Sequence, residues 1–221
     1  MYDAVIFDND GVLLTLTSMD AHREGAREAL VEAGADDPDN EAIETMSIGV
    51  TVEKLEDICA TYDLDPAQTW RIRDRVLSEK QQAEMRAGEK TPYDDIHHLE
   101  RFECPLGVVS SNQQATVEFA YDHFDLHGHF ETVHARPPTI ESLRRKKPEP
   151  YYVEAAMESL GAERPLFVGD NESDVQAAEA AGIDSAFIRR PHRTEFDLSV
   201  TPDHEVHSLE DVLALTDGPS A

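Results

Sequence analysis

The sequence predicts an α/β fold in which a parallel sheet carries helices on both faces and an all-helical domain is inserted after the first strand. Two observations lead to this prediction. Short apolar runs alternate with helix-patterned stretches over most of the chain, which is typical of a parallel sheet covered by helices. Between about residues 18 and 86, however, the pattern is helical and contains no convincing strand.

The apolar runs and the helical stretches define the predicted sheet. The predicted strands are Val5–Phe7, Leu106–Val109, Leu166–Val168 and Ala186–Ile188. The predicted helices between them are Ala115–Phe124, Tyr151–Leu160 and Ser173–Ala181. Gly182 follows the last of these helices, where a C-terminal cap is expected. This order favours a Rossmann-like parallel sheet with helices on both faces.

The helical stretch near the N-terminus interrupts the alternation of strands and helices. It contains AHREGAREALVEAG and AQTWRIRDRVLSEKQQAEMRAG, with no strand signal between them. We therefore predict an inserted helical domain over residues 15–86, within an α/β core of residues 1–14 and 87–221. Trp70 is expected in the core of the inserted domain.

Charge is the unusual global property of this chain. With 46 acidic residues, 19 basic residues and a formal net charge of −27, the chain should repel nucleic acid and anionic membranes, so neither is expected as a partner. The spread of acidic residues over every segment resembles that in proteins of salt-accumulating halophiles, and an acidic mesophilic protein is the alternative.

The chain has no apolar run of about 18 residues and no secretory signal pattern. With only Cys59 and Cys104, far apart, we expect a cytoplasmic protein without a disulfide framework.

Polar clusters follow the predicted strands at the edge where ligands bind to open parallel sheets. Asp8 and Asp10 follow the first strand, in VIFDNDGVLL, and would repel each other unless a cation or a donor offsets their charge. The other clusters are Ser110, Ser111 and Asn112; GDNESD from Gly169 to Asp174; and RRKKPEP from Arg144 to Pro150. Carboxylate oxygens suit Mg2+, whereas a lysine, a hydroxyl group and backbone amides suit a phosphate.

These four clusters, in this order, resemble the four motifs of the haloacid dehalogenase superfamily. FDNDGVL resembles the first motif, VVSSN the second, KKPEP the third, and FVGDNESDVQAAEAAG the fourth together with its helix. The resemblance covers nearly the whole chain and is closest to the phosphatase branch with a helical cap after the first motif, which is phosphoglycolate phosphatase-like. It implies that the inserted domain is this cap.

The resemblance also implies roles for the two leading aspartates. Asp8 would be the nucleophile that attacks phosphorus and forms an aspartyl-phosphate. Asp10 would protonate the leaving alkoxide and then activate water as a base. Gly11 would allow the tight turn that follows.

The remaining motif residues would bind phosphate and metal. Ser110 and the amide of Ser111 would bind the phosphoryl oxygens, and Lys147 would stabilise Asp8 and the charge of the transferred group. The resemblance assigns Mg2+ to the Asp8 carboxylate, the Asp10 carbonyl, Asp170 and Asp174. Asp174 lies one turn into the helix after Asp170, so both can face one ion.

Each assignment has a purely structural alternative. Asp170 and Asp174 could be acidic residues that favour a helix N-terminus, and Ser110 could be a turn or capping residue. Lys147 could belong to a solvated basic run, although two of only five lysines side by side in so acidic a chain argue for an anionic ligand.

Two further features lie outside the motifs. His123, His127, His129 and His134 crowd one stretch, but their spacing matches no metal motif, so a helix end and an exposed loop is the preferred interpretation over zinc. The stretch HARPPTIESLRR, from His134 to Arg145, is interpreted as a long linker that borders the substrate entrance. Within it, Arg136 is a candidate second contact to an anion.

The predicted function is magnesium-dependent hydrolysis of a small phosphate monoester through an aspartyl-phosphate. A sugar phosphomutase of the same superfamily shares all four motifs and is the alternative. A haloacid dehalogenase is disfavoured, because that branch lacks the acid at the position of Asp10, and a non-catalytic acidic binding module would need neither aspartate. The expected partner is a small phosphorylated metabolite. Its identity, the cap residues that select it (Gly49 and its neighbours are candidates) and the oligomeric state are not determined.

Overall fold

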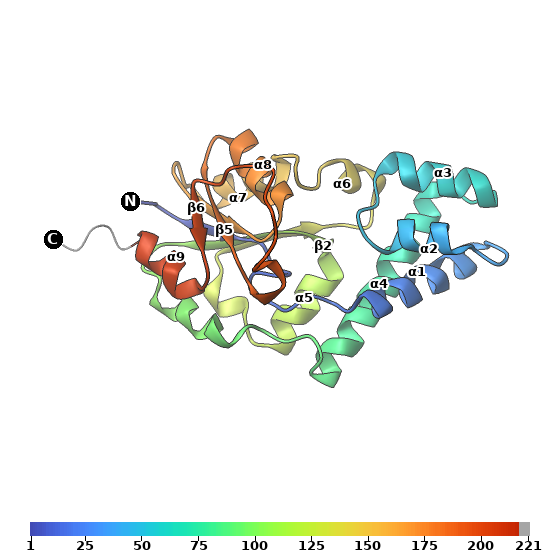
Figure 1. Ribbon diagram of the computed structural model, residues 1–221, viewed down its shortest axis with the longest axis horizontal. Coiled ribbons are helices and arrows are strands. Elements are labelled where there is room, and N and C mark those ends of the chain that lie inside the picture. The colour runs from blue at the N-terminus through green and yellow to red at the C-terminus, as the bar shows by residue number, and fades with distance from the viewer. Residues whose placement is uncertain (217–221) are drawn as a thin grey trace.

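A six-stranded parallel sheet forms the centre of the protein, as a computed structural model shows for the described residues, 1–216 (Figure 1). The strand order is β3-β2-β1-β4-β5-β6. The strands are β1 (Val5–Phe7), β2 (Leu106–Gln113), β3 (Thr132–Arg136), β4 (Leu166–Gly169), β5 (Asp184–Ile188) and β6 (His204–Val206). Strand β1 pairs with both β2 and β4, with Val5 opposite Leu106 on one side and Leu166 on the other.

Helices cover both faces of this sheet. They are α5 (Gln114–His123), α7 (Tyr151–Leu160), α8 (Glu172–Ala181) and α9 (Leu209–Thr216). The short helix α6 (Ile140–Arg144) instead packs against the inserted helices, and short 3₁₀ helices complete the core: η1 (Asp94–Arg101), η2 (His127–His129) and η3 (Pro191–Arg193). Because side chains alternate along a strand, Val5 and Phe7 pack in one apolar cluster, with α5 and α9, whereas Ile6 packs in another, with α7 and α8. Figure 1 shows the two helix layers on opposite sides of the sheet. The predicted fold class is confirmed.

Four helices between β1 and β2 form a separate block, which we call the helical block. They are α1 (Met19–Ala33), α2 (Asn40–Ser47), α3 (Val52–Tyr62) and α4 (Pro66–Ala87). Each begins after a residue whose side chain accepts a hydrogen bond from the first turn: Ser18, Asp39, Thr51 and Asp65. The block has its own apolar cluster, which contains Trp70, and lies beside the sheet (Figure 1).

The structure differs from the sequence prediction mainly at the sheet edges. The prediction does not include strands β3 and β6, because both are short edge strands, TVHAR and HEV, that lack the continuous apolar run of the predicted strands. The stretch from His134 to Arg145 is therefore not a plain linker, since it contains the end of β3 and the short helix α6. Among residues 1–216, no helix has the length and apolar character needed to cross a membrane. The domain boundaries at residues 14 and 87 stay a prediction.

Candidate active site

The first motif lies at the carboxyl end of the central strand. Asp8 follows β1 directly, and its backbone N–H donates to the carbonyl of Val168 on β4 (2.8 Å). The side chain of Asp8 is buried, and the Lys147 ammonium lies 2.7 Å from its Oδ1. The same ammonium lies 2.6 Å from Oδ1 of Asp174, on α8. One buried cation therefore joins two buried carboxylates from different motifs.

Burial and charge change the titration of these groups in opposite directions. Burial raises the pKa of Asp8 to about 8; the Asp174 and Asp170 carboxylates add to this, and Lys147 opposes it. Burial alone would lower the pKa of Lys147, but the charges of Asp174 and Asp8 raise it above its ordinary value. Lys147 is therefore a permanent cation, and the crowded carboxylates still require further positive charge.

Three carboxylates at this point can face one ion. Among the described residues, oxygens of Asp8, Asp170 and Asp174 lie within 4.8 Å of one another, and all three residues are buried. Two glycines make this approach possible. A Cβ on Gly11, which has a φ of +83°, would lie 2.5 Å from Oδ2 of Asp170, and a Cβ on Gly169 would lie 2.2 Å from the Cβ of Asp174. An all-oxygen set of this kind fits a hard divalent cation such as Mg2+.

Asp170 has basic partners that the sequence analysis missed. His192 Nε2 lies 2.7 Å from its Oδ2, and Arg193 Nε donates to the same oxygen (3.1 Å). Both residues lie at η3, in the stretch after β5, which reaches the same edge of the sheet. The available signal was the basic run RRPHR directly after a predicted strand in an acidic chain.

Asp10 is held by a different set of residues. The ammonium of Lys90 contacts its Oδ1, and Asn112 Nδ2 donates to its Oδ2 (2.8 Å). Lys90 is completely buried and also donates to Thr17 Oγ1 (2.9 Å) and Gln81 Oε1 (3.2 Å). Burial raises the pKa of Asp10, but the charge of Lys90 and the hydrogen bonds from Lys90 and Asn112 lower it overall. The second aspartate is therefore held ionised, at the junction with the helical block.

The second motif lies beside Asp8, because Val108 of β2 pairs with Phe7 of β1. Ser110 is buried, and its hydroxyl group accepts from the N–H of Asn112 (3.1 Å). The carbonyl of Ser111 accepts from Arg136 Nε (3.2 Å). Ser110 and Ser111 thus belong to β2, which continues to Gln113, rather than following the strand as predicted.

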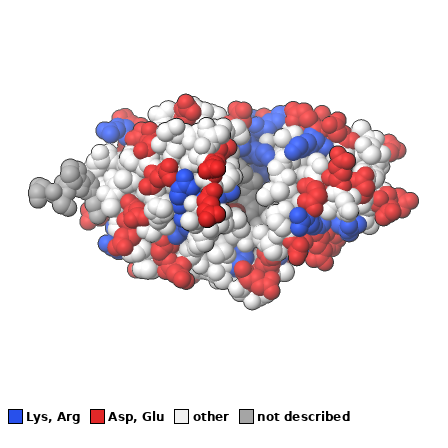
Figure 2. Space-filling view, in the orientation of Figure 1, with Lys and Arg blue, Asp and Glu red and all other residues white. Residues whose placement is uncertain are grey.

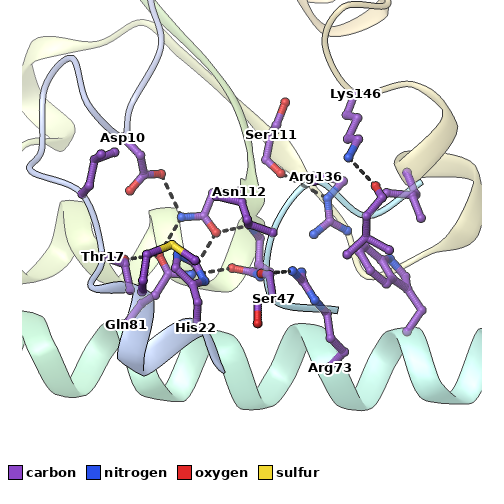
Figure 3. A pocket seen from close by; sticks show the side chains of 18 residues that line it. Asp10, Thr17, His22, Ser47, Arg73, Gln81, Ser111, Asn112, Arg136 and Lys146 are labelled. Atoms are coloured by element: carbon purple, nitrogen blue, oxygen red, sulfur yellow. Dashed lines mark hydrogen bonds between the residues drawn. The ribbon is translucent and has the colours of Figure 1, made fainter. Parts of the chain in front are cut away.

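A cavity of about 320 Å³ extends from this edge of the sheet into the helical block. Its walls include Asp10, Ser111 and Asn112 from the sheet side and His22, Trp70 and Arg73 from the block. Figure 2 shows a hollow between the two parts of the molecule, with basic residues at its margin. Figure 3 shows Asp10, Asn112 and Gln81 on one side of the cavity and Arg73, Arg136 and Lys146 on the other.

The crowded histidines do not form a metal-ligand group among the described residues. His127 contacts Asp122 (3.0 Å), and His134 contacts the hydroxyl groups of Thr132 and Ser159. His123 ends α5 and His127 and His129 form η2, whereas His134 lies within β3 rather than in the exposed loop of the preferred interpretation.

The geometry of the site can be compared with known proteins. Residues 5–188 match the family model described as haloacid dehalogenase-like hydrolase. The chain belongs to this family. The family predicted from the four motifs is therefore confirmed.

Relatives of this hydrolase include two proteins named pyrophosphatase PpaX. The protein from Oceanobacillus iheyensis is 28% identical over 126 residues, which cover 56% of this chain and 57% of the relative. The protein from Bacillus velezensis is 26% identical over 176 residues, which cover 78% of this chain and 74% of the relative. The match thus spans little more than half the length of the first relative.

Solved structures share the fold over nearly the whole chain. CbbY from Rhodobacter sphaeroides, in complex with phosphate, is 23% identical with a TM-score of 0.71 and covers 96% of both chains. A protein from Lactobacillus plantarum with a provisional assignment as a phosphoglycolate phosphatase is 21% identical with a TM-score of 0.66, covering 97% of this chain and 99% of its own. A further structure of CbbY contains xylulose-(1,5)bisphosphate and has a TM-score of 0.69, at 23% identity over 93% of this chain and 94% of that one. At these identities the likeness concerns the fold.

Proposed function

We propose that this protein is a magnesium-dependent phosphatase that hydrolyses small phosphate monoesters through an aspartyl-phosphate on Asp8. The observation that carries the proposal is the buried Lys147 ammonium between Asp8 and Asp174, 2.7 and 2.6 Å away. In this proposal the cation offsets the repulsion between the anionic nucleophile and an anionic substrate. The pyrophosphatase relatives and the phosphate-bound neighbour support phosphoryl chemistry.

The nucleophile in this proposal is the carboxylate of Asp8. An oxygen of Asp8 forms a bond to phosphorus while the bond from phosphorus to the ester oxygen breaks. Lys147 favours the ionised form of Asp8 and offsets the repulsion between this carboxylate and the phosphoryl oxygens. Ser110 and the backbone N–H of Ser111, on the adjacent strand β2, would hold those oxygens.

The three clustered carboxylates would hold Mg2+, together with the main-chain carbonyl of Asp10. Bound Mg2+ supplies positive charge that neutralises the phosphoryl group and the carboxylates around it. The close approach of Asp170 over Gly11 fits such a site, because any side chain at Gly11 would displace this carboxylate. His192 and Arg193 orient Asp170 from the outer side.

Asp10 would transfer the protons in both steps. As an acid it gives a proton to the leaving alkoxide, and as a base it takes one from the water that hydrolyses the aspartyl-phosphate. The contact with Lys90 favours the ionised form, which the second step needs. The helical block would act as the cap, since the cavity beside Asp10 is walled by both parts of the chain.

The test compares Asp8→Asn with Asp10→Asn, using the exposed Asp36→Asn as a control of equal charge change. Asp8→Asn should release phosphate only at background rate and form no phosphoenzyme. Asp10→Asn should lower the rate of phosphate release from an alkyl phosphate by about 10²–10⁴-fold. It should lose less with an aryl phosphate, whose leaving group hardly needs a proton, and should then accumulate phosphate on acid-quenched enzyme.

Two results would contradict this assignment. One is phosphoenzyme in Asp8→Asn but not in Asp10→Asn, which would reverse the two roles. The other is conversion of a sugar phosphate to its isomer without release of inorganic phosphate, which would indicate a phosphomutase.

A further inference from the structure

The side of the cavity away from Asp10 carries more cations than carboxylates. Arg73 on α4, Arg136 at the end of β3 and Lys146 before the third motif all line it, as Figure 3 shows. Asp74 is the carboxylate that faces them. Arg136 donates to it twice (2.6 and 2.9 Å), and Arg73 donates once (3.2 Å). Three cations against one carboxylate leave an excess of positive charge in an acidic protein.

Two of these cations keep donors for a further acceptor. Lys146 donates to the carbonyl of Val50, which engages one of its three N–H groups. Arg73 donates to the carbonyls of Met46 and Ser47 and to Asp74, which engages three of its five N–H groups. Asp74 pairs mainly with Arg136, so an anion from outside the chain is the natural partner for Lys146 and Arg73.

Two buried polar atoms in the walls of the same cavity have no hydrogen-bond partner among the described residues. One is the indole Nε1 of Trp70, which can only donate, and the other is Nδ1 of His22. Buried polar atoms are rarely left unpaired, because that loses the hydrogen bonds they make to water. Trp70 and His22 both line the cavity, so a polar ligand bound there would be close to these atoms.

The titration of two cavity residues agrees with the excess positive charge. Burial, followed by the charges of Arg136 and Arg73, lowers the pKa of Lys146 to about 8. Burial, followed by the charges of Arg73 and Lys90, lowers the pKa of His22 to about 4. A bound anion would favour the charged form of Lys146 and so raise its pKa again.

We infer that Lys146 and Arg73, with the indole N–H of Trp70, bind a second anionic group of the substrate, carried by its leaving group. The substrate class is then a phosphate ester whose alcohol part bears a carboxylate or a second phosphate. This inference deepens the proposed function and rests on it for the position of the first phosphate. The cavity volume of about 320 Å³ lies within the range of small-molecule sites.

The test measures kcat and KM for three probes with wild type, Lys146→Met and Lys146→Arg. Phosphoglycolate carries a carboxylate, fructose 1,6-bisphosphate carries a second phosphate, and glycerol 3-phosphate has a neutral alcohol part. Lys146→Met should raise KM on the order of 10- to 100-fold for at least one anionic probe, the loss typical of a hydrogen bond to a charged group. Its KM for glycerol 3-phosphate should change less than about twofold, because that probe has no group for Lys146 to bind. The two anionic probes separate carboxylate from phosphate recognition.

Matched variants exclude a general effect of charge or folding. Lys80→Met also removes one positive charge, but Lys80, on α4, pairs with Glu24 and Glu28 away from the cavity. All three KM values should therefore stay at their wild-type level. Lys146→Arg keeps the cation and should recover most of the affinity. Equal losses for all three probes, or no loss for either anionic probe, would overturn the inference.

The pH profile gives a second readout. The charged groups around Lys146 are Arg136 from β3, Arg73 and Asp74 from α4, and Lys54 from α3. Lys146 is protonated below about pH 8 and neutral above it. In wild type, kcat/KM for the preferred anionic probe should fall above about pH 8 relative to glycerol 3-phosphate, and Lys146→Arg should abolish this difference. Parallel profiles in wild type would contradict the role of Lys146.

A binding measurement separates this inference from the proposed function. Calorimetric titration of the anionic probes into Asp8→Asn, with Mg2+ present, requires no turnover. If Asp8→Asn binds an anionic probe with an affinity that depends on Lys146, but the wild-type protein releases no phosphate from any probe, the proposed function is rejected and the anion site is kept. Turnover without any dependence on Lys146 would reject the anion site and keep the function.

Discussion

Asp74→Asn tests the buried ion pair that joins the helical block to the sheet. The Asp74 carboxylate on α4 accepts two hydrogen bonds from Arg136 on β3, and both side chains are 2% exposed. The substitution keeps the shape of the side chain but removes its charge. Arg136 then stays buried without a counter-charge, and Arg73 loses the same partner.

The expected loss follows from this burial. Removing one partner of a buried ion pair destabilises a protein by about 3–5 kcal/mol, because the other charge is left uncompensated. For a chain of this size each kcal/mol lowers Tm by about 2–4 °C, so Tm should fall by about 6–20 °C. A surface pair would contribute less than about 1 kcal/mol.

The assay is thermal and denaturant unfolding followed by circular dichroism, at one fixed salt concentration. Asp57→Asn, at an exposed position on α3, makes the same change in net charge and should stay within about 0.5 kcal/mol of wild type. In a double-mutant cycle, Arg136→Met should lower the free energy of unfolding far less in the Asp74→Asn background than in wild type, because the Arg136 charge has already lost its partner there. A Tm for Asp74→Asn within about 2 °C of wild type, or additive losses in the cycle, would refute the reasoning.

Three further predictions concern metal, salt and glycine. A chelator should abolish hydrolysis and added Mg2+ should restore it, with Ca2+ a poor substitute because it prefers more ligands at longer distances; full activity in chelator would exclude the metal. If the net charge of −27 is a halophilic adaptation, Tm should rise from low to molar NaCl as self-repulsion is screened, and a Tm independent of salt would reject that idea. Gly11→Ala and Gly88→Ala both place alanine at positive φ (83° and 74°), and this backbone strain should lower the free energy of unfolding by about 1 kcal/mol in each. Only at Gly11 would the new methyl group also meet Asp170, at 2.5 Å. Gly11→Ala alone should therefore need more Mg2+ for half-maximal activity, and an equal requirement in both variants would contradict the site.

Local patterns in the sequence were sufficient for the fold class and for the motif positions. Helix α7 has the bounds that the sequence predicts, Tyr151–Leu160, because its apolar periodicity is encoded within ten residues. The positions of Asp8 and Asp170 at strand ends follow from short apolar runs of the same kind. The short edge strands β3 and β6 were missed, since their pairing depends on a neighbour that no local pattern identifies.

The surroundings of the motif residues were decided by the tertiary structure alone. Lys90 contacts Asp10 across 80 residues of sequence, and Arg136 contacts Asp74 across 62. His192 reaches Asp170 only because β5 lies beside β4 in the sheet. Strand alternation and helix periodicity constrain neighbours a few positions apart, whereas a contact between distant segments depends on how the whole chain packs. The sequence by itself predicted which residues form the candidate site, and the packing of distant segments, within the sheet and between the sheet and the helical block, determined which charges surround them.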